Sequence, residues 1–176
     1  MAHVTLLDDS DEPTAKALIE KLKAGRRGSL LGIYKALLHN PALAESWFNH
    51  LKAVRWGTTL SGRMRELLII RVGWRLNSAY IMKQHIPKLA VPEGVSEEDC
   101  AALLREEISA RFSDEERAAL QLADELTVKA ALSTETAAAV KRAFGERGLV
   151  EMSVLVGTYN MHARFVGGLA IELEKD

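Results

Sequence analysis

The chain has 176 residues, of which 48% are hydrophobic, and its 23 Lys and Arg nearly balance 24 Asp and Glu, for a net charge of −1. This length can bury a substantial core, so we expect one domain over residues 1–176, with 1–12 an extended N-terminal segment. The balanced charge excludes a global field that would recruit nucleic acid or an anionic membrane, and neither partner is expected.

The single cysteine, Cys100, excludes an intramolecular disulfide, a Cys-x-x-Cys pair and a Cys-rich zinc module. No basic, signal-like region opens the sequence, and no apolar stretch approaches the roughly 20 residues that cross a bilayer. We therefore expect a cytoplasmic protein.

The first third of the chain shows helical periodicity and little strand alternation. Proline is tolerated in a first helical turn, so Pro13 is predicted to open a helix, which Gly25 ends. A second helix is predicted for 29–38, stopping before Pro41 because proline disfavours the helical conformation of the residue before it. A third helix is predicted for 41–53.

The middle of the chain predicts two consecutive helices. Ser61 or Thr59 is expected to cap a helix that reaches about residue 74, where Gly73 and Asn77 weaken its end. Ser78 is the predicted N-cap of a new helix that ends near residue 90.

Three further helix starts follow, at Ser96, Ser113 and Ser133, each with acidic residues in the first turn. The helix that starts at Ser133 is expected to end near 144–145. A last helix, from about residue 147 toward 173, carries little charge over its centre, so we expect it to be the most buried, in the core or at a subunit contact. The sequence predicts an all-α, single-domain bundle of about eight helices.

The segment from Arg65 to His85 resembles the signature of the carboxymuconolactone decarboxylase and alkylhydroperoxidase-D-like (AhpD-like) superfamily. Redox members of this superfamily carry a Glu, then a Cys-x-x-Cys pair, then a His. Glu66 and His85 stand at the outer positions, but Ser78 and Ile81 replace the two cysteines. Segments 95–103, 112–126 and 149–164 are also similar to family members. The resemblance implies the carboxymuconolactone decarboxylase fold and a homo-oligomer, a trimer or hexamer.

Thiol peroxidase activity is expected to be absent. Serine cannot be oxidised to a sulfenic acid, and Ile81 offers no resolving thiol. Cys100 shares a predicted helical face with Leu103 and Leu104, so we expect it to be a small buried hydrophobe.

The residues that remain in the motif indicate acid/base chemistry. Ser78, Ile81 and His85 project from one face of a regular helix, at roughly 100° per residue, and can line one cavity. Glu66 reaches that cavity if the helices pack as in the family, and a carboxylate there would orient the imidazole. The alternative is that Glu66 and His85 are an unrelated surface charge and polar residue.

Tyr80 is the fourth catalytic candidate, beside Glu66, His85 and Ser78, because non-redox relatives often carry Tyr there. On a regular helix its side chain points about 160° away from the His85 face, so it reaches the pocket only if the first turn is distorted. The substrate-binding candidates are Arg71, Trp74, Ile81, Met82, Tyr159, Asn160 and His162.

Two of these candidates carry a specific expectation. The Arg71 guanidinium could hold a substrate carboxylate bidentately, but a solvated face or ion pairs with Glu residues at a subunit contact are the alternatives. Asn160 lies in a mostly apolar segment, so it needs a hydrogen-bond partner.

No cofactor is expected. A metal, if bound, would take Glu66, His85 and perhaps His162, but no local spacing matches a metal motif, so none is expected. We expect a cofactor-free acid/base lyase or isomerase that acts on a small carboxylated or carbonyl compound, with decarboxylation implied by the resemblance alone. The alternative is a non-catalytic relic of the alkylhydroperoxidase scaffold that binds a ligand or a protein partner.

Overall fold

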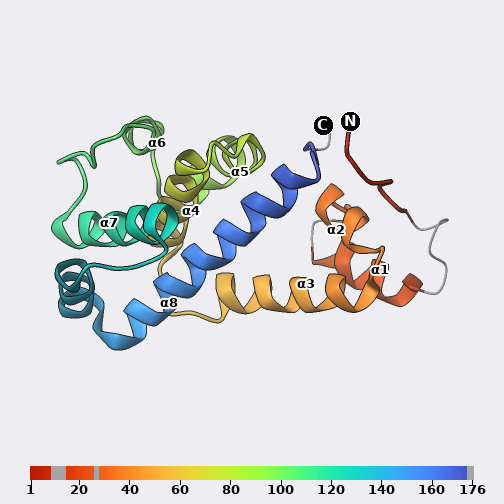
Figure 1. The fold of residues 1–176 in the computed structure, drawn as a ribbon, viewed down its shortest axis with the longest axis horizontal. Coiled ribbons are helices and arrows are strands. Elements are labelled where there is room, and N and C mark those ends of the chain that lie inside the picture. The colour runs from red at the N-terminus through yellow and green to blue at the C-terminus, as the bar shows by residue number, and fades with distance from the viewer. Residues whose placement is uncertain (9–14, 26–27, 174–176) are drawn as a thin grey trace. The chain divides into compact units, whose positions relative to one another are not determined.

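The computed structural model describes residues 1–8, 15–25 and 28–173, and over these residues it contains helices and no strand (Figure 1). The predicted all-α fold is therefore confirmed. The helix start expected at Pro13 lies outside the described residues.

Contacts divide the chain into two compact units. Met1–Ala53 and Phe165–Asp176 form what we call the terminal unit, and Val54–Arg164 form the central unit. The organisation as one domain over 1–176 stays a prediction. Every candidate residue named above lies in the central unit.

The terminal unit begins with α1 (Lys16–Ala24) and α2 (Gly32–Leu37), followed by α3 (Pro41–Trp56), whose last turn belongs to the central unit. Two predicted boundaries were wrong. α2 starts at Gly32, not at residue 29, because the residue before it is extended, with φ −68° and ψ 149°. α3 continues past residue 53 to Trp56, up to the break that begins at Gly57.

α4 (Gly62–Arg75) is the most continuously buried helix of the central unit. The Ser61 hydroxyl accepts a hydrogen bond from the Met64 backbone N–H at 3.1 Å, which confirms one of the two predicted caps. Every residue from 66 to 73 is buried, and α4 packs against α5, α6 and α7. The expectation that the last helix is the most buried was therefore wrong.

α5 (Ala79–His85) starts where the chain turns sharply. Asn77 adopts a left-handed conformation, with φ 49°, and Ser78 is the N-cap, as predicted. The helix then widens into a π-helix, Ile86–Ala90, followed by the 3-10 turn Val91–Glu93. Pro87 cannot donate a backbone hydrogen bond, and π-turns are frequent beside functional residues. His85 is the last α-helical residue before this change of register.

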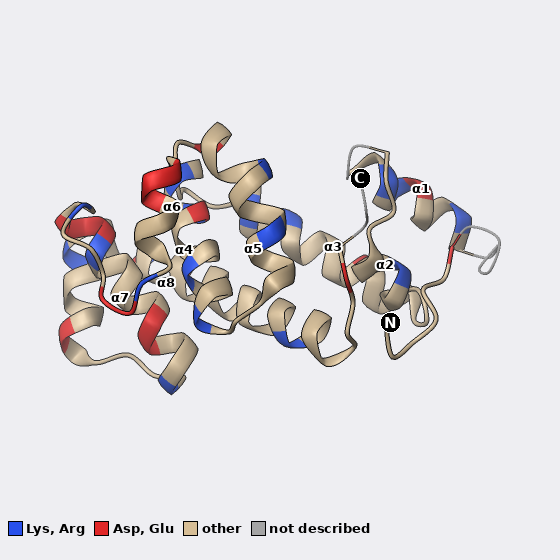
Figure 2. Cartoon of the chain, turned by 90° about the horizontal axis from the view of Figure 1, so that it is seen from above, with Lys and Arg blue, Asp and Glu red and all other residues tan. Residues whose placement is uncertain are grey.

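α6 (Glu97–Leu103) and α7 (Asp114–Lys129) both begin with a complete capping box, set by Ser96 and Ser113. Figure 2 shows the acidic start of α6 clearly, and elsewhere both signs of charge are interspersed along the helices. The predicted starts of both helices are confirmed.

α8 spans Thr134–Gly168, with a break in helical geometry at Gly145, where φ is 69° and ψ is −178°. The break lies where one helix was predicted to end and another to begin. The helix ends at Gly168, before the expected limit near residue 173. One face of its second half is buried, and Val150, Val154 and Met161 are exposed on the other. Among the described residues, no helix has the length and hydropathy to cross a membrane.

Candidate functional site

Glu66 and His85 form a buried hydrogen-bonded pair between α4 and α5. His85 Nδ1 lies 2.6 Å from Glu66 Oε2, and the two residues are 4% and 0% exposed. An ionised carboxylate in this place would accept the hydrogen bond from Nδ1, and Nε2 of a neutral imidazole would then keep its lone pair. The structure thus brings together the two residues on which the acid/base interpretation depends.

Arg55, from the last turn of α3, is a third member that the sequence did not reveal. Its Nη2 donates to Glu66 Oε1 at 3.1 Å, so the two carboxylate oxygens have different partners. The Arg55 guanidinium also lies over the Trp56 ring, 5.1 Å from its centroid. We call Arg55, Glu66 and His85 the Glu66 cluster. Since the third helix was predicted to end at residue 53, no pattern placed Arg55 beside the motif.

Aromatic rings from α8 cover one side of His85. The Tyr159 ring meets the imidazole edge-on, with centroids 5.5 Å apart, and stacks on His162 at 5.7 Å. Tyr80 contacts His162, also at 5.7 Å. These four side chains, Tyr80, His85, Tyr159 and His162, form what we call the ring cluster. Tyr80 is buried, and its ring is connected to His85 through the rings of His162 and Tyr159.

Ser78 and Ile81 lie near the Glu66 cluster in sequence, but their printed contacts are local or apolar. The Ser78 hydroxyl accepts the Ile81 N–H at 3.5 Å, a long capping interaction. Ile81 is 1% exposed and belongs to the main core. It lies so close to Gly73 that a Cβ built there would be 2.7 Å from Ile81 Cγ2 and 3.6 Å from Met82 Cγ. These contacts show that α4 and α5 approach each other closely at Gly73. The roles predicted for Ser78 and Ile81 in the site stay predictions.

Arg71 is committed to a different buried network. Its Nε and Nη2 hold both carboxylate oxygens of Asp124, at 2.7 and 2.6 Å. Nη1 donates to two backbone carbonyls of residues 103–105, and Nη2 also donates to the Glu106 carbonyl. Arg75 binds the same carboxylate and the Glu106 side chain. We call Arg71, Arg75, Glu106 and Asp124 the Asp124 cluster.

Each guanidinium nitrogen of Arg71 therefore has a partner within the protein, so a substrate carboxylate would have to displace one. Trp74 lies between Arg71 and Arg75, with the guanidiniums 4.7 and 4.8 Å from its ring centroid. Burial opposes the charge of Asp124, but hydrogen bonds from Arg75 and Arg71 outweigh it and lower the pKa of this carboxyl. The ion-pair alternative for Arg71 matches this arrangement, although the partner is an Asp of the same chain.

Asn160 finds the hydrogen-bond partner that its position required. Its amide nitrogen donates to Thr127 Oγ1 at 2.9 Å and to the Val156 carbonyl at 3.0 Å, and Arg164 donates to its amide oxygen. These bonds tie α8 to α7 and to its own next turn.

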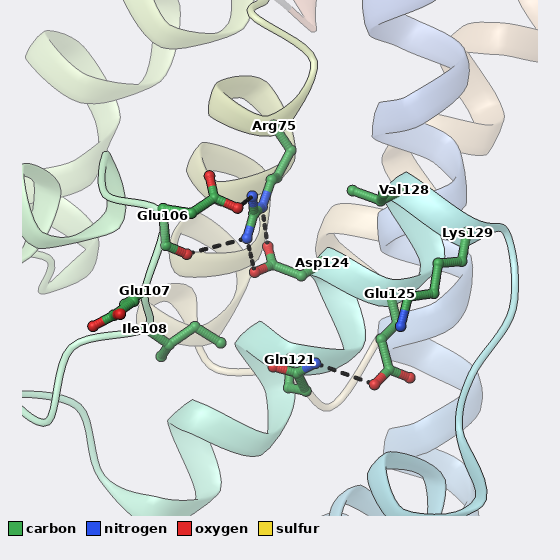
Figure 3. Close-up of a pocket in the computed structure, with 9 residues that line it drawn as sticks. All are labelled: Arg75, Glu106, Glu107, Ile108, Gln121, Asp124, Glu125, Val128 and Lys129. Atoms are coloured by element: carbon green, nitrogen blue, oxygen red, sulfur yellow. Dashed lines mark hydrogen bonds and ion pairs between the residues drawn. The ribbon is translucent and has the colours of Figure 1, made fainter.

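A surface depression of about 360 Å³ lies apart from the Glu66 cluster, between α7 and the segment that follows α6. Figure 3 shows Arg75 between Asp124 and Glu106 at one end, and Gln121 directed at Glu125 at the other. In this depression Arg75 is paired with Asp124 and Glu106, and Gln121 donates a hydrogen bond to Glu125. We place the candidate site at the Glu66 cluster because a hydrogen-bonded His–Glu pair, not a saturated ion network, can transfer a proton.

Cys100 is buried in a second apolar cluster, which includes Leu67 and Leu103. Burial raises the pKa of its thiol, so it is held in the unreactive protonated form. Over the residues that the structure describes, no group of three or more His, Cys, Asp or Glu side chains is arranged to hold a metal ion.

Residues 41–125 match the model of the Carboxymuconolactone decarboxylase family. No curated protein matches the chain. Solved structures are similar in fold at low sequence identity. The debrominase Bmp8, in complex with 2,3,4-tribromopyrrole, is 18% identical with a TM-score of 0.79, over 99% of this chain and 94% of that one.

Two peroxidase-related proteins are also similar. One, from Silicibacter sp. TM1040, is 17% identical with a TM-score of 0.78, over 98% of this chain and 88% of that one. The other, an alkylhydroperoxidase AhpD core from Ralstonia eutropha JMP134, is 12% identical with a TM-score of 0.83, over 99% and 93%. The family match over residues 41–125, the helical fold and the presence of a single cysteine together support the resemblance to the carboxymuconolactone decarboxylase and AhpD-like superfamily.

Proposed function

We propose that the chain is a cofactor-free acid/base lyase or isomerase, in which His85 transfers a proton and Glu66 orients it. The observation that carries the proposal is the 2.6 Å hydrogen bond between the buried Glu66 carboxylate and the His85 imidazole. A positioned histidine is the commonest general acid/base in enzymes, and a carboxylate on Nδ1 fixes which nitrogen reacts. No redox centre is required for this chemistry.

The substrate we propose is a small planar carboxylated or carbonyl compound. A carbonyl makes the neighbouring C–H bond acidic enough for an imidazole to remove its proton, and Tyr159 and His162 offer flat rings beside His85. The similar debrominase was solved with 2,3,4-tribromopyrrole, which is also a small planar ring. Ser78 and Tyr80 are proposed as hydrogen-bond donors to the substrate.

Proton transfer to carbon provides a direct test. Purified protein would be incubated in D₂O with a panel of lactone acids and cyclic ketones, and loss of the α-proton NMR signal and release of carbon dioxide would be followed together. Catalysed exchange or decarboxylation is expected, falling by about 10²–10⁴-fold in His85→Ala, the typical contribution of a general acid/base.

His50→Ala is the matched control, because His50 is exposed on α3 outside the central unit. It should keep the activity of the unmodified protein. Activity that survives in His85→Ala would rule the proposal out. Absence of turnover across the panel, with a ligand still bound, would favour the non-catalytic alternative.

Assembly as a homotrimer or homohexamer stays a proposal. Val150, Val154 and Met161 are exposed at spacings of four and seven residues, so they lie on one face of α8. Sedimentation of the protein would measure its mass in solution.

A further inference from the structure

The charges of the Glu66 cluster decide in which protonation state the site rests. A guanidinium is a permanent positive charge in proteins, and Glu66 lies against that of Arg55 with no solvent exposure. An ionised Glu66 beside Arg55 makes a neutral pair. His85 lies on the other carboxylate oxygen. With a neutral imidazole the cluster has no net charge, and with a protonated imidazole it carries one uncompensated positive charge in the protein interior.

An uncompensated buried charge is disfavoured, because low-dielectric surroundings solvate it poorly. Over the residues that the structure describes, the titratable and charged groups in contact with the pair or with its neighbours include no second carboxylate. They are Arg55 from α3, Tyr80 from α5, Tyr159 and His162 from α8, and the Cys100 thiol from α6, whose pKa is raised by burial. Glu66 is thus the one carboxylate seen in contact with His85 among the described residues, and Arg55 already neutralises it.

Arg55 makes fewer hydrogen bonds than Arg71. Its Nε, like that of Arg65, is buried and has no hydrogen-bond partner among the described residues, whereas each guanidinium nitrogen of Arg71 donates to at least one oxygen. Its side chain is 14% exposed and is placed by Glu66 on one side and the Trp56 ring on another. In this arrangement the positive charge of Arg55 lies against the carboxylate of Glu66 and compensates its negative charge.

We propose that Arg55 is a positioning residue that holds Glu66 ionised and His85 neutral, with the imidazole proton on Nδ1. The inference rests on the proposed function, and it adds that the first proton step is abstraction by His85 Nε2. A substrate C–H bond breaks, its proton goes to Nε2, and the electron pair moves into the adjacent carbonyl to form an enolate. The imidazolium then returns the proton to another carbon, so neither an oxidant nor a reductant is needed. This order fits isomerisation or elimination better than decarboxylation, in which a C–C bond breaks first and the resulting carbanion takes up a proton afterwards.

The ¹⁵N signals of the His85 ring, read in histidine-labelled protein at pH 7 without substrate, test this directly. The unmodified protein should show the neutral tautomer with the proton on Nδ1. In Arg55→Met, the ratio of protonated to neutral imidazole should rise about tenfold or more, since a like charge a few ångströms away is removed. Arg55→Gln keeps a hydrogen-bond donor toward Glu66 and should behave like Arg55→Met, because charge is what matters. Arg55→Lys restores the charge and should restore the neutral imidazole.

Arg65→Met is the matched control. Arg65 is the neighbour of Glu66 in sequence and is 12% exposed, but its bonds go to Glu93 and the Leu60 carbonyl. Its substitution should leave the His85 signals unchanged. A doubly protonated imidazole in the unmodified protein, or an unchanged neutral tautomer in both Arg55→Met and Arg55→Gln, would overturn the inference. Since these spectra need no substrate, they stand or fall separately from the turnover assay with His85→Ala.

Discussion

Helix α4 contributes a residue to each of two charged clusters, and these clusters differ in the second partner of their carboxylate. The Asp124 cluster and the Glu66 cluster both contain a carboxylate and an arginine, and α4 contributes Arg71 to one and Glu66 to the other. In the Asp124 cluster two guanidiniums share one carboxylate. In the Glu66 cluster the second partner of the carboxylate is an imidazole, the side chain that most often serves as a general acid or base. The difference in one residue type separates a structural network from a candidate catalytic one.

The contrast also shows why buried charge by itself does not indicate function. The arginine that a sequence interpretation favours for substrate binding, Arg71, is the more deeply buried and the more completely bonded of the two. Arg55 has fewer bonds and lies beside a group that can titrate. Its proposed role follows from the chemistry of that neighbour and not from the depth of its burial.

The largest expected effect comes from Asp124→Asn. This change leaves Arg71 buried without its carboxylate partner, while Arg75 keeps its ion pair with Glu106, so the free energy of unfolding should fall by about 3–5 kcal/mol. Urea unfolding followed by circular dichroism would measure it, while activity per folded molecule should be retained. The matched carboxamide change, Glu66→Gln, should do the reverse, with activity lost and a smaller loss of stability. Equal behaviour of the two variants would erase the distinction between the clusters.

A smaller effect is expected at the contact that places α5 against α4. Gly73→Ala puts a methyl group 2.7 Å from Ile81 Cγ2, and Ile81 is β-branched and 1% exposed, so it cannot easily move. Overpacking of this kind costs about 1–3 kcal/mol, which exceeds the gain of up to about 1 kcal/mol in helix propensity. Thermal unfolding should show a lower melting temperature, and activity should fall because His85 moves with α5.

Gly157→Ala is the matched control for this contact. Gly157 is also helical, but nothing lies within 4 Å of its Cβ position, so only the helix propensity changes. Its stability should be equal or slightly higher. A loss at Gly157 as large as at Gly73 would mean that packing on Ile81 is not the cause.

The smallest effect at neutral pH, and a growing one in acid, is expected from the carboxylates that join helix ends. Burial of Asp99 opposes its charge, but hydrogen bonds from Arg63 and Arg111 outweigh it and lower its pKa to about 2. The Ser133 backbone N–H is the largest cause that lowers the pKa of Glu125, also to about 2. Both values lie below those of an unfolded chain, which are about 4.

A carboxyl group with a lowered pKa in the folded state stabilises the protein fully above its unfolded value and progressively less as pH falls toward its folded one. Stability should therefore be nearly constant from pH 7 to about 5 and decline between about pH 4 and 2. Urea midpoints across this range would measure the decline, which should be reduced in Asp99→Asn. A flat profile down to pH 2 would contradict this assignment.

Helix starts were predictable because the signal is local. Ser61, Ser78, Ser96 and Ser113 each cap the helix that follows, since a side-chain oxygen and a backbone N–H three residues later meet whatever the rest of the chain does. Helix ends were less predictable. α3 continues beyond the predicted end at residue 53, and α8 ends at Gly168, before the predicted limit near residue 173. The sequence carries no strong stop signal at these places, so packing decides where each helix ends.

Helical periodicity in the sequence determined the all-α class, and the resemblance to the superfamily signature indicated the missing redox pair and the two residues of the Glu66–His85 pair. The tertiary structure alone decided that Arg55 joins Glu66, that Arg71 belongs to Asp124 and that the Tyr80 ring contacts His162. These partners are far apart along the chain or on different helices. Side-chain packing between helices, which no local pattern encodes, selects them.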